Sequence, residues 1–492
     1  MDVAFVIPNS GQGFIQREFK FAGESRPASP YTLAEILGVL EEHEPEVGLH
    51  VVDAQIEHWS PAEAESKLDE IDPDLVVGLL SCFHIPEDRE YVELPYPTIG
   101  IITPCSVDAA EADRIYDLDI DYFTRMEVET TILEAVREFD ETGDIVESNG
   151  LYRRTGDGLV GTGPPEQWSR EHPMPAFERA GFDRYYEAMQ IDLGDEARVL
   201  LNTMKGCPFE CTFCCEANTD FLNIKSADQV LAEVERIREL TGCQTFQFID
   251  DEFGIRLSRA KDLCRSLRDL EYDVQFEAMN RVEFVDEELI RLAEEAGCYL
   301  MSFGIESGDQ RVQEAIDKNL DFEHAKEAFG YLGETDIDTR AFTIVGLPGE
   351  REETLDKTKS LLRELDPDLI TTGVCYPSPC TPMYNRLKAE GKLLDERWHI
   401  YRNKEALVFE HDYYDSMAEV KERVDDLNNW WLRYRVGRQL RTTPHSPATV
   451  EALISYLGTF PALRSAVSDS RVLSSAHHFV RDRIAKPAGK PN

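Results

Sequence analysis

The sequence predicts an α/β protein in three parts. These are an N-terminal doubly wound (Rossmann-like) parallel sheet, a partial (βα)6 barrel of the TIM-like kind and a helical C-terminal region. Short apolar runs alternate with helical patterns over the first 140 residues, six more such pairs follow, and the end of the chain shows only helical periodicity. A chain of 492 residues is long enough for two or three domains. The expected boundaries are 1–140, 141–197 (a connector), 198–400 and 401–492.

The N-terminal region has the element order of a parallel sheet covered on both faces. Apolar runs predict strands at residues 3–8, 47–54, 75–81 and 97–103. Apolar residues at helical spacing, such as Leu33, Ile36 and Leu40, predict helices at 31–42, 61–71 and 128–139. Ligands of such sheets bind at the carboxyl ends of the strands.

The connector and the barrel region follow. Thr155-Gly156-Asp157 lies between two short strand-like runs and predicts a hairpin, and prolines then interrupt regular structure. Strands are expected at 199–203, 245–249, 274–278, 300–305, 341–345 and 369–374, with helices that include 226–240, 259–270, 287–296 and 352–365. Functional residues of βα barrels gather at the carboxyl ends of the strands.

Three cysteines, Cys207, Cys211 and Cys214, follow the first barrel strand within eight residues. Three thiolates on one loop suit three corners of a four-iron cluster and leave one iron open to another ligand. Zinc is an alternative, but it usually needs a fourth Cys or His at short spacing, and Cys215 is adjacent to Cys214. Three chance core cysteines are the other alternative.

The spacing Cys-x3-Cys-x2-Cys, with Phe213 before the last cysteine, resembles the radical S-adenosylmethionine (radical SAM) superfamily. The resemblance implies a 4Fe-4S cluster on the three cysteines, with its open iron bound to S-adenosylmethionine. One electron, from a donor such as ferredoxin or flavodoxin, would cleave this cofactor. The resulting 5′-deoxyadenosyl radical would abstract hydrogen from an unactivated carbon of a small-molecule or lipid-like substrate.

Motifs after the next strands also resemble this family. Asp250 and Asp251 stand where the family receives the ammonium of S-adenosylmethionine, and Arg281 stands where its carboxylate would be met. An ordinary acidic strand end and a surface ion pair are the structural alternatives. Glu306 and Ser307, in Gly304-Ile305-Glu306-Ser307-Gly308, match the step beside the ribose. Gly346, in Gly346-Leu347-Pro348-Gly349-Glu350, matches the step that flanks the adenine; each of these two motifs is otherwise a tight turn.

The N-terminal region resembles the cobalamin-binding domain of one large radical SAM subfamily. Two positions depart from that pattern, because Thr103-Pro104 and Met126 stand where glycines are usual. Cobalamin with methyl transfer, radical rearrangement or oxidation without cobalamin, and a non-enzymatic metal- or cobalamin-binding protein all stay open. A radical methylthiotransferase is disfavoured, since only two cysteines precede Cys207 and no basic RNA-binding module follows the barrel.

The formal net charge of −44 is spread along the whole chain. Such a surface repels itself in dilute salt and predicts a cytoplasmic protein of a halophile. It disfavours nucleic acid as a partner, and no apolar run approaches the ~20 residues of a membrane span. A helix over 417–441 is expected to pack over the barrel mouth, with Trp430-Trp431 as core or pocket residues. Cys380 is interpreted as an inert small residue of a loop, with a contact to substrate as the alternative. Residues 485–492 are expected to be disordered.

Overall fold

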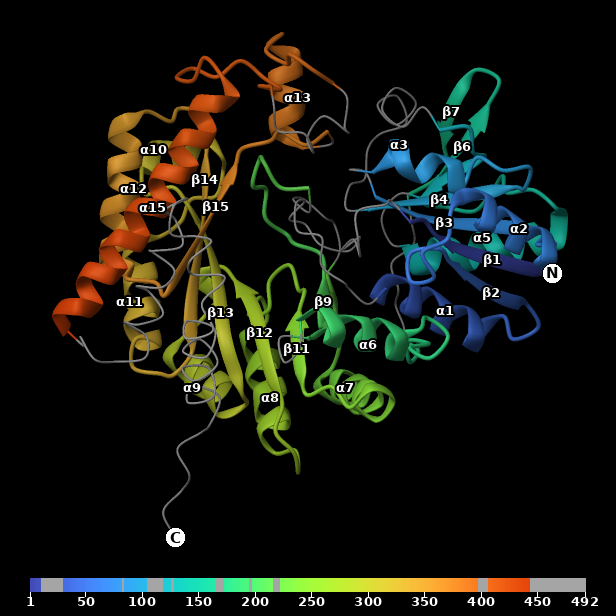
Figure 1. The fold of residues 1–492 in the computed structure, drawn as a ribbon, viewed down its shortest axis with the longest axis horizontal. Coiled ribbons are helices and arrows are strands. Elements are labelled where there is room, and N and C mark those ends of the chain that lie inside the picture. Colours follow the sequence, from blue (N-terminus) through green and yellow to red (C-terminus); the bar gives the residue numbers. More distant parts are fainter. Residues whose placement is uncertain are drawn as a thin grey trace.

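The computed structural model describes the backbone of residues 1–9, 30–81, 84–103, 118–124, 128–164, 172–193, 197–215, 222–379, 381–396 and 406–442. Some of the predictions above concern residues outside this part of the chain, namely Pro104, Met126, Cys380 and residues 485–492. Two α/β units stand side by side, with the helical region at the far side of the second unit (Figure 1).

The N-terminal unit is built on a seven-stranded sheet of order β2-β1-β3-β4-β5-β6-β7. Its first five strands are parallel, and β6 and β7 form an antiparallel hairpin that extends the sheet through β5. The expected hairpin is therefore confirmed. The strands are Asp2–Ile7, Gly48–Asp53, Leu75–Ser81, Thr98–Thr103, Tyr122–Thr124, Leu151–Thr155 and Gly158–Gly161.

Helices cover both faces of this sheet, which confirms the doubly wound prediction. Alternate residues of β1 point to opposite faces, as the two-residue period of a strand requires. Val3 and Phe5 pack with α1 (Tyr31–His43) and α5 (Val128–Thr142), whereas Ala4 and Val6 pack with α2 (Pro61–Ile71). The short α3 (Ile85–Asp88) and a 3-10 turn (Arg89–Tyr91) add to the α2 side.

The second unit is an open, all-parallel six-stranded sheet of order β15-β14-β13-β12-β11-β8, which confirms the partial barrel. The predicted strands agree with the observed bounds to within three residues. The strands are β8 (Val199–Leu201), β11 (Thr245–Phe248), β12 (Gln275–Asn280), β13 (Cys298–Glu306), β14 (Asp338–Val345) and β15 (Leu369–Val374). The first strand ends at Leu201, two residues earlier than predicted.

Helices on one side of this sheet begin where the local sequence supplies caps. The Ser226 hydroxyl accepts a hydrogen bond from the backbone N–H of Gln229 at 3.2 Å, which fixes the start of α7. Asp286 caps α9 in the same way. The helices are α7 (Ala227–Thr241), α8 (Leu257–Arg268), α9 (Glu287–Glu295), α10 (Gln310–Ala315), α11 (Phe322–Leu332) and α12 (Glu352–Leu365).

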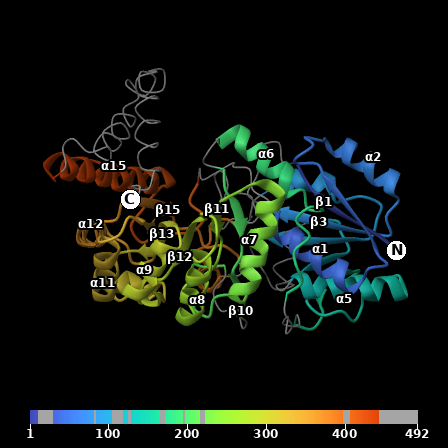
Figure 2. The ribbon, with the colours of Figure 1, turned by 90° about the horizontal axis from the view of Figure 1, so that it is seen from below.

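The second half of the connector contains α6 (Phe182–Leu193) and lies between the two units (Figure 2). A Cβ atom on Gly38 of α1 would lie 2.3 Å from the carbonyl oxygen of Met174, so only glycine allows this approach. The rings of Phe177 and Phe182 are tilted against each other with their centres 4.8 Å apart, and both contact the ring of Tyr31. The aromatic contacts join the connector to the start of α1.

The barrel region ends with α13 (Pro382–Ala389), and the C-terminal region contributes the long α15 (Met417–Thr442), as its helical periodicity predicts. Val420, Leu427 and Trp431 are buried, so the apolar stripe is core. The expected place over the barrel mouth is wrong, because α15 runs along the edge strand β15, across that strand from α11 (Figure 2). An ion pair between Arg438 and Asp366 and a hydrogen bond from Thr372 to Asn428 fasten it there.

Candidate metal centre at the cysteine loop

The three cysteines lie on a loop whose two ends are paired. After β8 the chain forms the short β9 (Met204–Lys205), which pairs antiparallel with β10 (Asn223–Ile224). Gly206 leaves β9 with φ of 91°, a conformation that favours glycine. The β9–β10 ladder, named here the loop stem, closes the segment that holds Cys207, Cys211 and Cys214 at the carboxyl end of the first barrel strand.

The cysteine loop is anchored to two other elements by its backbone. The N–H of Thr212 donates to the carbonyl of Ile316, just after α10, at 2.9 Å. The carbonyl of Thr212 accepts from the N–H of Met383 in α13 at 2.8 Å. These two bonds fix Thr212, the residue after Cys211.

The two predicted acidic residues after β11 both accept hydrogen bonds from the backbone that leads into the cysteine loop. The buried Asp250 carboxylate accepts hydrogen bonds from the N–H and hydroxyl of Thr203 and from the N–H of Met204, at 2.5–3.0 Å. Burial raises the pKa of Asp250, against the opposing effects of Arg259 and these hydrogen bonds. Asp251 accepts from the N–H of Gly206 at 2.9 Å. The structure thus gives Asp250 a structural role in the loop that the sequence did not indicate.

Arg281, which follows β12, lies against the cysteine loop rather than at the surface. Its Nη1 donates to Cys211 Sγ at 3.5 Å, and its guanidinium lies 4.2 Å from the ring centre of Phe209. Its Nη2 donates to the carbonyl of Lys318 at 2.7 Å. The surface ion-pair alternative is therefore wrong, although Glu283 lies within 3.3 Å of Nη2.

Glu306 and Lys318 form a buried ion pair beside Cys211. Lys318 Nζ lies 2.8 Å from Glu306 Oε1, and each side chain is 7% exposed. Burial raises the pKa of Cys211, while Lys318 and Arg281 act in the opposite direction. Burial therefore favours the thiol in the metal-free chain, and the two cations oppose that effect. Nothing in the sequence around Lys318 identified it, because it is brought here by the turn after α10.

The glycines around Glu306 are required by close packing. A Cβ on Gly304 would lie 2.4 Å from Lys318 Nζ, and one on Gly308 would lie 2.6 Å from the carbonyl oxygen of Lys357. Ser307 Oγ accepts from the N–H of Asp309 at 3.3 Å. Glu306 itself has φ of 56°, an uncommon backbone conformation for a residue other than glycine.

Gly346 ends β14 with φ of 90°, next to a buried carboxyl group. Glu350 Oε1 accepts from the N–H of Gly346 at 3.0 Å and from the hydroxyl of Tyr414 at 2.5 Å. Burial raises the pKa of Glu350 to about 7, although both hydrogen bonds act to lower it. His411 lies over Gly346, since a Cβ there would be 3.0 Å from the His411 ring.

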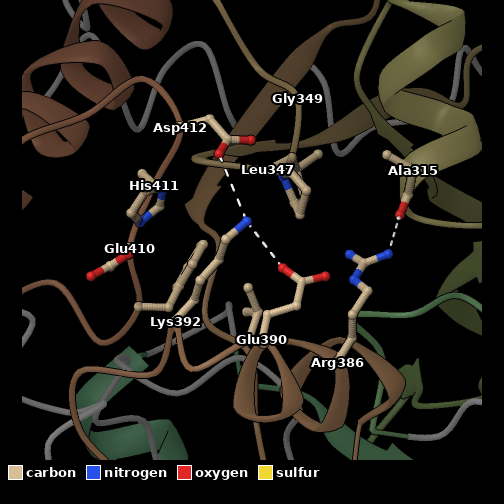
Figure 3. A pocket seen from close by; sticks show the side chains of 12 residues that line it. Ala315, Leu347, Gly349, Arg386, Glu390, Lys392, Glu410, His411 and Asp412 are labelled. Carbon is tan, nitrogen blue, oxygen red and sulfur yellow. Dashed lines mark hydrogen bonds and ion pairs between the residues drawn. The ribbon is translucent and has the colours of Figure 1, made fainter.

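A pocket opens beside this turn (Figure 3). Lys392 stands in it between Glu390 and Asp412, with the nearer oxygen, that of Glu390, at 3.0 Å. Phe213 packs against the apolar cluster that contains three of the lining residues, Leu347, Leu387 and Phe409. The lining consists of Ala315, Leu347, Pro348, Gly349, Arg386, Leu387, Glu390, Lys392, Phe409, Glu410, His411 and Asp412.

The thiols do not form a ready-made metal site. Within the described residues, no group of three or more His, Cys, Asp or Glu side chains is arranged to hold a metal ion. None of the three cysteines is in a disulfide. The donor set nevertheless fits an iron–sulfur cluster, because three soft ligands share one anchored loop and cations flank Cys211.

The fold and the site define a class: a partial α/β barrel with a three-cysteine loop at the end of its first strand. Residues 201–362 match the model of the radical SAM superfamily, a span that contains the loop, Asp250, Arg281, Glu306 and Gly346. This part of the chain is therefore similar to the radical SAM superfamily, and the two-part fold is like that of the solved structures described below.

Curated relatives share the same region. An uncharacterized methyltransferase of Pyrococcus horikoshii is 27% identical over 288 residues, which cover 57% of this chain and 61% of the relative. The anaerobic magnesium-protoporphyrin IX monomethyl ester cyclase of Cereibacter sphaeroides is 26% identical over 412 residues, which cover 80% of this chain and 65% of the cyclase. The chain thus spans less than two thirds of the length of either protein.

Solved structures share the fold at low identity. The radical SAM methyltransferase TsrM of Kitasatospora setae, with cobalamin and a [4Fe-4S] cluster bound, aligns with a TM-score of 0.63 at 19% identity, over 79% of this chain and 75% of TsrM. The cobalamin-dependent radical enzyme OxsB, with aqua-cobalamin and S-adenosylmethionine bound, aligns with a TM-score of 0.68 at 14% identity. That alignment covers 98% of this chain and 75% of OxsB.

Proposed function

We propose that this protein is a radical SAM enzyme that holds a 4Fe-4S cluster on Cys207, Cys211 and Cys214. The observation that carries the proposal is the position of these thiols, on one anchored loop at the carboxyl end of the first barrel strand. The cluster, when bound, supplies the electron that cleaves S-adenosylmethionine to methionine and the radical that abstracts hydrogen from the substrate. The electron reaches it from a reductant such as ferredoxin or flavodoxin.

The remaining candidate residues support a site for S-adenosylmethionine. We assign the carboxylate contact to Arg281, which lies against Cys211, and the ribose contact to Glu306 and Ser307. Asp251, at the edge of the loop, is favoured for the ammonium over Asp250, whose carboxylate oxygens accept from Thr203 and Met204. The pocket beside Gly346 and the packing of Phe213 support an adenine site there.

Methyl transfer with cobalamin is the reaction we favour after hydrogen abstraction. Several relatives have names as methyltransferases, and two enzymes with the same two-part fold hold cobalamin. The substrate is then a small or lipid-like molecule. The second candidate is radical oxidation or rearrangement without cobalamin; the similarity to a cyclase over four fifths of the chain supports a reaction other than methyl transfer.

Anaerobic reconstitution tests the proposal. The chain purified with iron and sulfide should contain about four of each and, after reduction, should release 5′-deoxyadenosine from S-adenosylmethionine. Zinc without iron or sulfide, and no cleavage, would instead support the non-enzymatic metal-binding alternative. Adding hydroxocobalamin to the full chain separates the two radical reactions, because a changed visible spectrum supports methyl transfer and an unchanged one supports the second candidate.

The setting of the enzyme follows from the charge of the chain. We propose a cytoplasmic protein of a halophile, without nucleic acid as a partner, because acidic residues outnumber basic ones by 95 to 51. In the part of the chain that the structure describes, no helix is long and apolar enough to cross a membrane. We retain the domain division 1–140, 141–197, 198–400 and 401–492 as a working division.

A further inference from the structure

A group of titratable side chains is largely buried where the N-terminal unit meets the loop stem. Tyr31 and Glu35 of α1 and Glu129 of α5 come from one unit, and Lys205, Lys225 and Glu233 come from the other. We name these six residues the interdomain ion cluster. Charged groups are rarely buried unless they are paired, so this arrangement indicates a specific contact between the units.

Lys205 joins the two helices of the N-terminal unit. Its Nζ lies 2.6 Å from Glu35 Oε2 and also contacts Glu129 Oε1. The glutamate side chains are 5% and 6% exposed, whereas that of Lys205 is 22% exposed. Both carboxylates therefore depend on Lys205 for compensation of their charge, Glu129 most of all.

Lys225 makes a second connection through the same carboxylate. Its Nζ lies 3.1 Å from Glu35 Oε1 and 2.8 Å from Glu233 Oε1, and it donates to the hydroxyl of Tyr31 at 2.6 Å. Tyr31 in turn donates to Glu233. Glu35 is thus shared between two lysines.

The two lysines mark the two strands of the loop stem. Lys205 is the last residue of β9, and Lys225 directly follows β10. Lys205 pairs with Asn223 across the ladder, and the N–H of Lys225 donates to the carbonyl of Thr203 at 3.1 Å. A displacement of Lys205 would move the residues that lead directly into Cys207.

We propose that Lys205 is a positioning residue for the metal centre, and that Glu35 and Glu129 of the N-terminal unit hold Lys205 in place. The inference rests on the proposed function, since it concerns the loop assigned to the cluster. It adds a role for the N-terminal unit that is independent of any ligand bound there. Without Lys205, the buried Glu129 loses its cation and Glu35 keeps only Lys225, so the stem separates from α1 and α5 to let water reach these carboxylates.

The first test uses the metal-free full chain. Cys211 is 8% exposed, so its alkylation by iodoacetamide reports opening of the loop. Lys205→Met should accelerate this reaction by about tenfold, and Lys205→Arg should restore most of the protection because its cation still spans both carboxylates. Circular dichroism of each variant verifies that it is folded.

Lys261 provides a control in which the partner carboxylates are exposed. It also pairs with two carboxylates, Asp286 and Glu288, each at 2.7 Å, and its side chain is 12% exposed, but these contacts lie within the barrel unit. Lys261→Met should therefore leave the alkylation rate of Cys211 unchanged. Equal rates for Lys205→Met and the unaltered chain would overturn the inference.

The second test uses the reconstituted chain. Lys205→Met should hold less than about half the iron of the unaltered chain, and the electron paramagnetic resonance of its reduced cluster should respond less to S-adenosylmethionine. Lys261→Met should match the unaltered chain in both respects, and an unchanged Lys205→Met would again contradict the inference. An unaltered chain without iron and sulfide would contradict the proposed function, and the alkylation rates would still decide whether Lys205 positions the loop.

Discussion

At the scale of single residues, Cys211 and Cys215 should differ although they lie four positions apart. Cys211 lies beside Arg281 and Lys318, whereas Cys215 packs against the apolar cluster on the α2 side of the N-terminal sheet. Cys211→Ala should reduce bound iron to near background, and Cys215→Ala should leave it unchanged. Iron and sulfide analysis after anaerobic reconstitution measures both. Full iron content in Cys211→Ala would remove the basis for the cluster assignment.

Glu350 should make stability depend on pH. Its pKa is raised by burial from 4.5 to about 7, so the folded chain binds this proton more tightly than the unfolded chain. The stability that comes from the neutral form is complete below pH 4.5 and is lost as pH rises through about 7.

The variant Glu350→Gln isolates this effect. Glutamine keeps an acceptor for Gly346 and Tyr414 but does not ionise. The variant should match the unaltered chain near pH 4.5 and exceed its free energy of unfolding by about 2–3 kcal/mol at pH 8. Denaturant titrations at both pH values measure the difference, and an equal pH dependence of the two proteins would refute it.

Sequence motifs identified the site residues at the strand ends better than the side chains that pair with them. Cys207 and Arg281 follow barrel strands and Glu306 ends one, so their gathering at one edge could be predicted from strand order alone. Lys318 and Lys205 could not be predicted, because their carboxylate partners lie in other elements and carry no local pattern. The use of Asp250 in hydrogen bonds to the loop was hidden for the same reason.

At the scale of elements, two glycines should respond oppositely to alanine. A Cβ on Gly308 would lie 2.6 Å from the Lys357 carbonyl oxygen, so α12 and the turn after β13 must separate. A Cβ on Gly330, inside α11, meets nothing within 4 Å. Gly308→Ala should destabilise the fold by about 1–3 kcal/mol, and Gly330→Ala should stabilise it by about 0.5–1 kcal/mol. Thermal and denaturant unfolding decide the signs, and a stabilising Gly308→Ala would contradict the packing.

Helices and strands with a strong apolar periodicity were predictable from the sequence, and those defined by tertiary contacts were not. Helices 61–71 and 352–365 and strand 369–374 match the structure at both ends, since caps and apolar periods are local signals. The two-residue strands β9 and β10 have no such signal, because only their mutual pairing defines them. The path of α15 along β15 depends on contacts such as Thr372 with Asn428, which are remote in sequence.

At the scale of the whole molecule, salt should govern stability. The formal net charge of −44 produces repulsion that is screened as the Debye length falls from about 10 Å at 0.1 M to about 3 Å at 1 M salt. The thermal midpoint should rise by on the order of 10 °C between 0.1 M and 2 M KCl. Sorbitol at equal osmolality is the control for general exclusion effects. A midpoint that is equal or higher in dilute buffer would contradict the proposed halophilic adaptation.

The interdomain ion cluster also has a consequence for the order in which the chain is made. Glu129 and its partner Lys205 are 76 positions apart, so Glu129 is synthesised first. Domains generally fold as units during synthesis, N-terminal first. The N-terminal sheet can therefore form while Glu35 and Glu129 are still hydrated, and burial of the carboxylates must wait until the loop stem emerges. The nascent chain thus keeps an acidic face in water until the segment that carries the three cysteines arrives to cover it.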